Sequence, residues 1–154
     1  MHGRMIAVIA PAKFKKMLDE NDGRLPLLTL DEFFKDNTEE DSIAPNQWEY
    51  GRPTLAEIWN LLREIEQMPN VAWVRVALHD DTEIVRDGGD EALILVGDSI
   101  ILCTDMDSGR LEKAVDCEWL CSDGVIELKQ AQIDTFSCVP PIPDNFKCLA
   151  IVWD

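Results

Sequence analysis

The chain has 154 residues, of which 46% are hydrophobic, so one folded domain with a substantial core is expected rather than a disordered segment. It contains 30 acidic and 14 basic residues, which gives a formal net charge of −16. This charge argues against binding to nucleic acid or to anionic membranes, whose phosphates it would repel, and it favours salt-sensitive association with a basic protein.

The first residues show no pattern of regular structure before Met5. Residues 1–4 are expected to form a disordered lead-in, so a single domain is expected to run from residue 5 to residue 154. Met5–Ala10 is apolar but shorter than the ~7–15 residues of a signal-peptide core, and lysines follow it, so it predicts an opening strand. No stretch approaches the ~20 apolar residues of a membrane span.

Two helices are predicted next. Pro11 suits the first turn of a helix, because its ring fixes φ and its missing N–H has no partner there. A T-x-x-E capping box at Thr29 and Glu32 predicts a second, short helix. Its apolar residues are Leu30, Phe33 and Phe34. Residues 35–50 then form a long polar connection, of a length typical of an ordered functional loop or a mobile one.

The clearest pattern lies in the centre of the chain. Thr54 and Glu57 form another capping box, and a helix is predicted over Pro53–Met68. Its apolar residues recur at spacings of three and four, which places them on one helical face. They are Leu55, Ile58, Trp59, Leu62 and Ile65. Val71–His79, rich in β-branched and aromatic residues, predicts the strand that follows.

An acidic stretch, Asp80–Glu91, follows this strand and contains Gly88-Gly89. Its carboxylates and glycines are typical of a calcium loop, but the spacing does not match D-x-[DN]-x-[DN]-G…E, so a solvated acidic loop is favoured. Ala92–Val96 and Ser99–Thr104 are apolar runs on either side of Gly97-Asp98, which predicts a β-hairpin with a two-residue turn. One long bent strand is the alternative.

The last third of the chain is predicted to consist of short elements. Ser108–Trp119 favours a short helix and Gly124–Leu128 a strand. Three prolines make residues 129–146 irregular, and Cys148–Trp153 predicts a terminal strand. The predicted fold class is therefore α+β, a single compact domain with a largely antiparallel sheet and the Pro53–Met68 helix packed on one face.

The pattern Leu30-x-x-Phe33-Phe34-x-x-Asn37, followed by Ser42-Ile43-x-x-Asn46, resembles one in a group of small bacterial proteins of unknown function. As in that group, an amphipathic helix and a strand of the Val71–Leu78 kind follow, and the chain ends in Trp153-Asp154. The resemblance covers most of the chain from about Leu28 and implies a compact α+β domain with no established catalytic residues. By analogy of size and acidity, the chain is also similar to immunity proteins that neutralise bacterial toxins.

Histidine is the first residue to consider for acid–base chemistry. His79 ends the predicted strand beside Asp80 and Asp81, where a His–Asp pair would serve such chemistry, whereas His2 lies in the lead-in. Adjacent strand residues point to opposite faces, so Asp80 is poorly placed to orient the imidazole and a structural role for His79 is favoured. Common nucleotide-binding, nucleophile-elbow and H-E-x-x-H motifs are absent, and no cofactor is expected.

The five cysteines show neither a disulfide framework nor a metal-binding pattern. They are Cys103, Cys117, Cys121, Cys138 and Cys148. Their odd number and the lack of a secretion signal predict reduced thiols in a cytoplasmic protein. Cys117-x-x-x-Cys121 would need Cys138 and Cys148 to complete a four-thiolate zinc site, so buried free thiols are favoured and no metal is expected.

These observations predict a non-catalytic, acidic protein-binding module, of the kind in which an immunity protein covers the basic groove of a toxin. Its surface is expected where residues 35–50 meet the acidic stretch, because an aromatic anchor among carboxylates suits a basic protein. The predicted partner-binding residues are Trp48, Tyr50, Asp80, Asp81, Glu83, Asp87 and Asp90. Trp48 folding back as a lid over the core is the other interpretation of that residue.

Two further hypotheses stay open. The first is a small enzyme or ligand-binding domain with a cleft between residues 35–50 and the sheet. The second is an acidic domain with no toxin partner, because acidity alone does not require one. The oligomeric state does not follow from the sequence.

Overall fold

Helix α1 (Pro11–Glu20) is the first element of the computed structural model, which describes residues 9–153 and only the backbone of Asp87. Pro11 occupies the first helical position, as predicted. The expected lead-in, residues 1–4, lies outside the described residues, and so does most of the predicted strand Met5–Ala10. The two described residues of that stretch, Ile9 and Ala10, are not in a strand.

Both predicted capping boxes are formed. The Thr29 hydroxyl accepts the N–H of Glu32, the Glu32 carboxylate accepts the N–H of Thr29, and α2 (Leu30–Phe34) begins there. An equivalent pair, Thr54 and Glu57, precedes α3 (Leu55–Glu66). Each box satisfies backbone N–H groups that have no partner inside the helix, which is why the starts of these helices were readable from the sequence.

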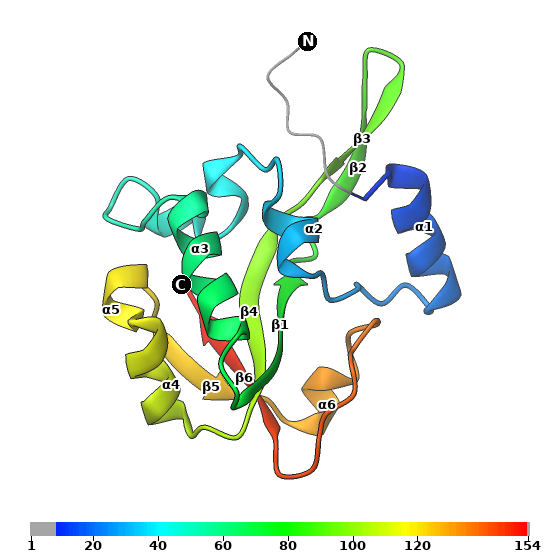
Figure 1. Ribbon diagram of the computed structural model, residues 1–154. Coiled ribbons are helices and arrows are strands. Elements are labelled where there is room, and N and C mark those ends of the chain that lie inside the picture. The colour runs from blue at the N-terminus through cyan, green and yellow to red at the C-terminus, as the bar shows by residue number, and fades with distance from the viewer. Residues whose placement is uncertain (1–8, 154) are drawn as a thin grey trace.

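The main sheet has four strands, β1 (Val71–Leu78), β4 (Gly97–Thr104), β5 (Gly124–Glu127) and β6 (Lys147–Val152). Their order is β1-β4-β6-β5, and each neighbouring pair is antiparallel (Figure 1). Strands β1, β5 and β6 lie where the sequence predicts strands. The α+β class with a largely antiparallel sheet is confirmed.

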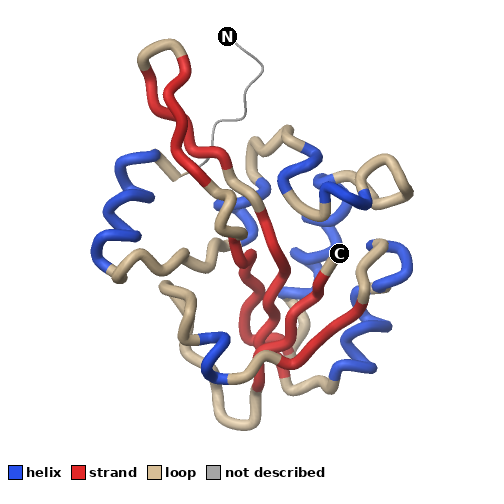
Figure 2. Tube along the Cα trace, turned by 180° about the vertical axis from the view of Figure 1, so that it is seen from behind, coloured by secondary structure: helices blue, strands red, loops and turns tan. Residues whose placement is uncertain are grey.

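Each face of this sheet is covered by a different part of the chain (Figures 1 and 2). α3 packs on one face together with α2 and with α4 (Ser108–Val115). Its buried residues have the predicted spacing, and only Trp59 of the predicted set is partly exposed. The opposite face is covered by Leu27 and by the segment from residue 128 to residue 146, which contributes Phe136, Val139 and Ile142.

The hairpin predicted from Ala92–Val96 and Ser99–Thr104 is wrong. The observed hairpin joins β2 (Glu83–Asp87) to β3 (Asp90–Ile94), and β4 begins at Gly97 as part of the main sheet. Gly88 and Gly89 form the turn with φ of 64° and 96°, which only glycine adopts readily and which a type I′ turn requires. The alternative of one long bent strand came closer, since β3 leads into β4 through only two residues.

Gly97 serves a close contact rather than a turn. A Cβ atom there would lie 3.0 Å from Cδ1 of Ile43 and 3.1 Å from Cζ of Phe33. Both neighbours are fully buried, and Ile43 also forms an isolated parallel bridge with Gly97. The missing side chain therefore lets the segment after α2 lie directly on the start of β4.

The remaining helices are short. The segment between α2 and α3 contains two 3₁₀ helices, η1 (Glu40–Ser42) and η2 (Pro45–Gln47). The predicted helix Ser108–Trp119 is divided into α4 and α5 (Cys117–Leu120), and α6 (Gln130–Ile133) interrupts the predicted irregular region. Within residues 9–153, no helix has both the length and the apolar character needed to cross a membrane.

Replacing Gly97 tests the close contact with Ile43. Gly97→Ala is expected to destabilise the protein by about 1–3 kcal/mol, because the added methyl group overpacks a filled site. Gly109→Ala is the matched control: its Cβ would meet only a carboxylate oxygen at 3.5 Å, and alanine favours the helix. Urea unfolding measures both variants. Equal stability of the two would show that the Gly97 site is not tightly packed.

Candidate functional site

The acidic stretch is a hairpin and not the solvated loop that the sequence favoured. We use the term acidic hairpin for the turn at residues 79–82 together with β2 and β3. It extends beyond the end of the main sheet (Figures 1 and 2). Four of the predicted partner-binding acids lie on it with exposed side chains. They are Asp80, Asp81, Glu83 and Asp90. Asp87 ends β2, and its side chain is not described.

Thr82 holds the turn at the base of the acidic hairpin to Val96, the residue just before β4. Its hydroxyl donates to the carbonyl of Val96 at 3.1 Å and accepts the N–H of Val96 at 3.0 Å. The N–H of His79 also donates to the Val96 carbonyl, at 2.7 Å. These three hydrogen bonds satisfy both backbone polar groups of Val96, and they join the base of the hairpin firmly to the sheet.

His79 has a structural part in this turn. Its Nδ1 accepts the backbone N–H of Asp81 at 3.0 Å, and the Asp81 carboxylate lies 3.5 Å from the same atom. A nitrogen that accepts a hydrogen bond carries no proton, so Nδ1 cannot donate to this carboxylate at the same time. The geometry supports the structural role that the sequence favoured for His79 over a His–Asp catalytic pair.

One face of the acidic hairpin packs on the body of the protein. Leu93 is buried in the main core, and Ile84, directly opposite it on β2, packs against that core. On the same face, Lys15 of α1 pairs with Glu91 at 2.5 Å. The hydrogen bond from Lys15 lowers the pKa of Glu91 below its usual value. α1 therefore lies beside β3 and is joined to it by the pair of Lys15 with Glu91.

The two predicted aromatic residues lie at a different place. Gly51 sits against α5, since a Cβ on it would be 3.7 Å from Sγ of Cys121. The segment of Trp48 and Tyr50 is therefore beside α5, on the far side of the domain from the hairpin (Figure 1). Only the first part of the long segment reaches the hairpin base, at Ile43. The structure thus gathers the acids and separates them from the aromatic pair.

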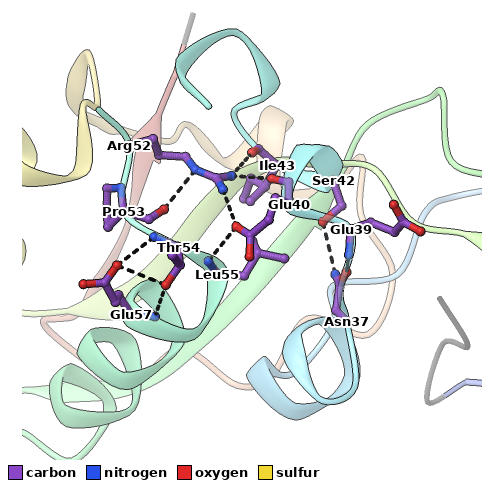
Figure 3. A network of polar contacts seen from close by, with 10 residues as sticks. All are labelled: Asn37, Glu39, Glu40, Ser42, Ile43, Arg52, Pro53, Thr54, Leu55 and Glu57. Carbon is purple, nitrogen blue, oxygen red and sulfur yellow. Dashed lines mark hydrogen bonds and ion pairs between the residues drawn. The ribbon is translucent and has the colours of Figure 1, made fainter. Parts of the chain in front are cut away.

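Arg52 organises this long segment, and sequence reasoning did not single it out. Its guanidinium is fully buried and donates to the carbonyls of Glu40 and Ile43, at 2.7 and 2.6 Å (Figure 3). A third bond reaches the carbonyl of Pro53, and Nη2 pairs with the Glu40 carboxylate at 2.7 Å. The same carboxylate accepts the N–H of Leu55 at the start of α3. No periodic pattern links Glu40 to Arg52, so the sequence offered no signal for the pair.

The surroundings of Arg52 determine its charge state and the position of Trp48. Burial lowers the pKa of Arg52, and the Glu40 carboxylate opposes this by favouring the charged form. Arginine stays protonated under such shifts because its pKa starts so high. The guanidinium also lies 4.7 Å from the centre of the Trp48 ring, which is half-buried but belongs to neither core cluster. Tyr50 is 81% exposed.

The residues that carry the family resemblance serve the fold. Asn37 donates to the carbonyl of Phe33 at 3.0 Å. It also donates to the Ser42 hydroxyl at 3.1 Å and accepts the N–H of Glu39 at 2.9 Å (Figure 3). The apolar members of the pattern are buried. They are Leu30, Phe33, Phe34 and Ile43. This pattern therefore specifies how the chain turns from α2 into η1 and does not form an exposed site.

A pocket of about 440 Å³ lies between α2, the end of α3 and β1. Two arginines line it, each stacked on an indole: Arg63 on Trp59 at 4.5 Å and Arg75 on Trp73 at 5.9 Å. Acidic side chains line it as well, and Glu66 lies 3.7 Å from Arg75. The pocket is therefore polar and close to neutral in charge.

The cysteines do not assemble into the alternative zinc site. Cys148 is buried beside Cys103, directly across β4 and β6, whereas Cys138 is exposed. Among residues 9–153, no group of three or more His, Cys, Asp or Glu side chains is arranged to hold a metal ion. Burial raises the pKa of Cys103 to about 12, and it also raises the pKa of Cys148 and Cys117. These thiols lack the thiolate character of a nucleophile.

Removing the guanidinium of Arg52 tests its structural role. Arg52→Ala is expected to destabilise the protein by about 3 kcal/mol, because it leaves buried carbonyls without donors and breaks the pair with Glu40. Arg63→Ala, which removes an exposed arginine stacked on a tryptophan, is the control and is expected to lose less than about 1 kcal/mol. Urea unfolding compares the two. Equal losses would contradict the assignment of Arg52 as the organising contact.

Alkylation tests the environment of the thiols. In the folded protein at about pH 8, iodoacetamide is expected to label Cys138 first, because only thiolates react and this thiol is exposed. Cys103 and Cys148 are expected to stay unlabelled until denaturant is added, since their raised pKa values leave almost no thiolate at this pH. Peptide mapping by mass spectrometry identifies the labelled sites. Labelling of Cys103 as fast as Cys138 in the folded state would contradict this environment.

Comparison with known proteins finds a matching family model. No curated protein and no solved structure matches the chain. A family model described as the uncharacterized protein YfbO family matches residues 9–151, which is nearly the whole described chain. The match confirms that the chain belongs to a family whose function is not characterized, as the resemblance implied. The chain belongs to the uncharacterized YfbO family.

Proposed function

We propose that this protein is a non-catalytic binding module that engages a basic protein through its acidic hairpin. The observation that carries the proposal is the position of the hairpin, which extends past the main sheet and exposes Asp80, Asp81, Glu83 and Asp90. Between residues 80 and 91 the sequence has six acidic residues and one basic residue. A strong local negative charge therefore lies on a part of the fold that extends beyond the main sheet (Figure 1).

Exposed charge of this kind mainly raises the rate at which the two proteins associate. A chain with a net charge of −16 attracts a basic protein over distances near the Debye length, and an exposed cluster directs the approach to one place. Pairs at the rim of an interface contribute mostly to the association rate. The firm attachment of the hairpin through Thr82 keeps these carboxylates in place, so little ordering is needed on binding.

The specific role we propose is that of an immunity protein for a toxin that acts on nucleic acid. The active groove of such a toxin is basic because its substrate carries phosphates. An acidic hairpin inserted in that groove would imitate the charge of the substrate and exclude it. This mechanism needs no catalytic group, in keeping with the structural role of His79 and the weakly acidic buried thiols.

Trp48 and Tyr50 belong to this proposal as a second contact. Tyr50 is 81% exposed, and tyrosine supplies a large contact area with little conformational freedom to lose. Because these residues lie beside α5, a partner would touch them and the hairpin together only if it spanned the domain. Arg52 already covers one side of the Trp48 ring, so Tyr50 is the better anchor of the two.

A ligand-binding domain is the second candidate, favoured by the pocket that contains Arg63 and Arg75. Guanidinium groups present several N–H donors to carboxylate or phosphate groups. However, Arg75 is already bonded to the carbonyl of Val74 and lies near Glu66, and Arg63 donates to Asn60. These existing partners make the acidic hairpin the better-supported site.

Retention of a partner at two salt concentrations tests the proposed function. The immobilised protein is expected to retain a basic protein from an extract of its own host cells at about 20 mM salt and to release it at about 300 mM, because salt shortens the Debye length. The variant Glu83→Gln with Asp90→Asn is expected to retain about tenfold less of that protein. Both positions are exposed, so its unfolding transition is expected to match that of the wild type.

The matched control makes the same change in charge elsewhere. Glu64→Gln with Asp144→Asn neutralises two exposed acids, one in α3 and one just before β6, and this variant is expected to retain the partner as the wild type does. Equal loss from both double variants would assign binding to overall charge and not to the hairpin. Failure of the wild type to retain any basic protein would contradict the proposed function.

A further inference from the structure

The edges of the main sheet are closed by specific contacts. On β1, Val76 exchanges two backbone hydrogen bonds with Leu28, at 2.8 and 3.0 Å, and the N–H of Val74 donates to the Glu66 carboxylate at 3.3 Å. On β5, the N–H of Val125 donates to the Glu112 carboxylate, also at 3.3 Å. Side chains and a paired residue thus occupy the groups that another strand would use.

The outer edge of β2 has no such cover from residues 9–153. Asp87 and Asp90 flank a two-residue turn and so form a bonded pair, and bonded and non-bonded pairs alternate along an antiparallel ladder. The backbone of Val85 therefore faces β3, whereas that of Ile84 and Arg86 faces away from it. Within residues 9–153, no strand pairs with this edge and no side chain bonds to the backbone of Ile84 or Arg86.

The side chains beside this edge form a short apolar strip with acids at its ends. Cross-strand partners share a face, so Val85, Ala92 and Ile94 lie on the face opposite Leu93. All three are half-buried, and none is part of either core cluster. Exposed Glu83 stands opposite Ile94 at the sheet end of this face, and exposed Asp90 stands at the turn end.

A second copy of this chain does not suit the edge. Each copy carries a net charge of −16, and two β2 edges side by side would bring their acids together, which is unfavourable on neighbouring strands. An extended basic segment suits it better. On a strand added beside β2, two basic residues with three residues between them would lie opposite Glu83 and the turn end of β2, and an apolar residue midway would lie opposite Val85. Asp90, one strand further away on β3, would add to the negative charge at the turn end.

We propose that β2 binds such a segment as an added strand, through the backbone of Ile84 and Arg86. The segment carries the pattern basic-x-apolar-x-basic and belongs to the partner protein. This inference rests on the proposed function and adds how the partner is held: backbone hydrogen bonds contribute affinity, and the acids and the apolar strip select the sequence.

A synthetic peptide tests the strand addition directly. The probe is acetyl-Thr-Lys-Thr-Val-Thr-Lys-Thr-amide, and its control carries N-methyl groups on the two threonines next to valine, which removes the hydrogen-bond donors but no charge. Titration followed by amide chemical shifts is expected to give about tenfold weaker binding for the methylated peptide. Amide exchange at Ile84 and Arg86 is expected to slow with the first peptide, while exchange at Val85, already bonded to β3, stays unchanged.

A pair of variants tests the same edge from the protein side. Arg86→Pro removes the outward N–H at an edge position, where proline is tolerated, and Arg86→Ala removes the same side chain but keeps that N–H. Only Arg86→Pro is expected to weaken peptide binding, by about tenfold. Unchanged shifts of Val85 and Ala92 in the variant would show that the hairpin is still formed.

The outcomes separate the strand addition from the proposed function. Equal binding of the two peptides, with shifts confined to the acidic hairpin, would overturn the strand addition and leave the proposed function standing on charge. Binding of neither peptide would also overturn the strand addition. The retention experiment with the wild type decides the proposed function independently.

Discussion

The buried guanidinium of Arg52 is the contact on which the arrangement of this domain most depends. It joins the carbonyls of Glu40, Ile43 and Pro53 and pairs with the Glu40 carboxylate, which in turn receives an N–H at the start of α3 (Figure 3). A buried charge is unfavourable without partners, so the segment between α2 and α3 must close around it. That closure holds Ile43 against Gly97 and converts a long polar connection into an ordered part of the body.

This ordered body explains where a working surface is available. Asn37, Ile43 and the residues around them are occupied with holding α2, η1 and β4 together, and both edges of the main sheet are covered. The acidic hairpin is the part of the described chain that the core supports from one face only, through Leu93 and the pair of Lys15 with Glu91. Its other face carries half-buried apolar side chains between exposed acids, and no strand of residues 9–153 pairs with its outer edge. Negative charge there disfavours pairing with a second copy, and the proposed strand addition would place a basic segment on this edge.

The high negative charge has consequences for stability as well as for binding. Thirty acidic residues repel one another in the folded state, and pairs such as Lys15 with Glu91 and Arg52 with Glu40 offset part of this repulsion. The apolar core on the two faces of the main sheet therefore supplies most of the stabilisation. Acids such as those of the hairpin are exposed, and solvent screens their charge.

The sequence by itself determined the elements whose signals are local. The capping boxes at Thr29 and Thr54 begin helices because each satisfies backbone groups within one turn, and the spacing of Leu55, Ile58, Leu62 and Ile65 placed α3 on the sheet. The acidic character of the hairpin was equally plain. Contacts between residues far apart in the sequence were decided only by the tertiary structure. Gly97-Asp98 and Gly88-Gly89 look alike as turns, and only the packing of Ile43 and Phe33 on Gly97 assigns the turn to the second pair. The pairing of Arg52 with Glu40 and the separation of Tyr50 from the acids likewise depend on contacts across the fold, for which no sequence period exists.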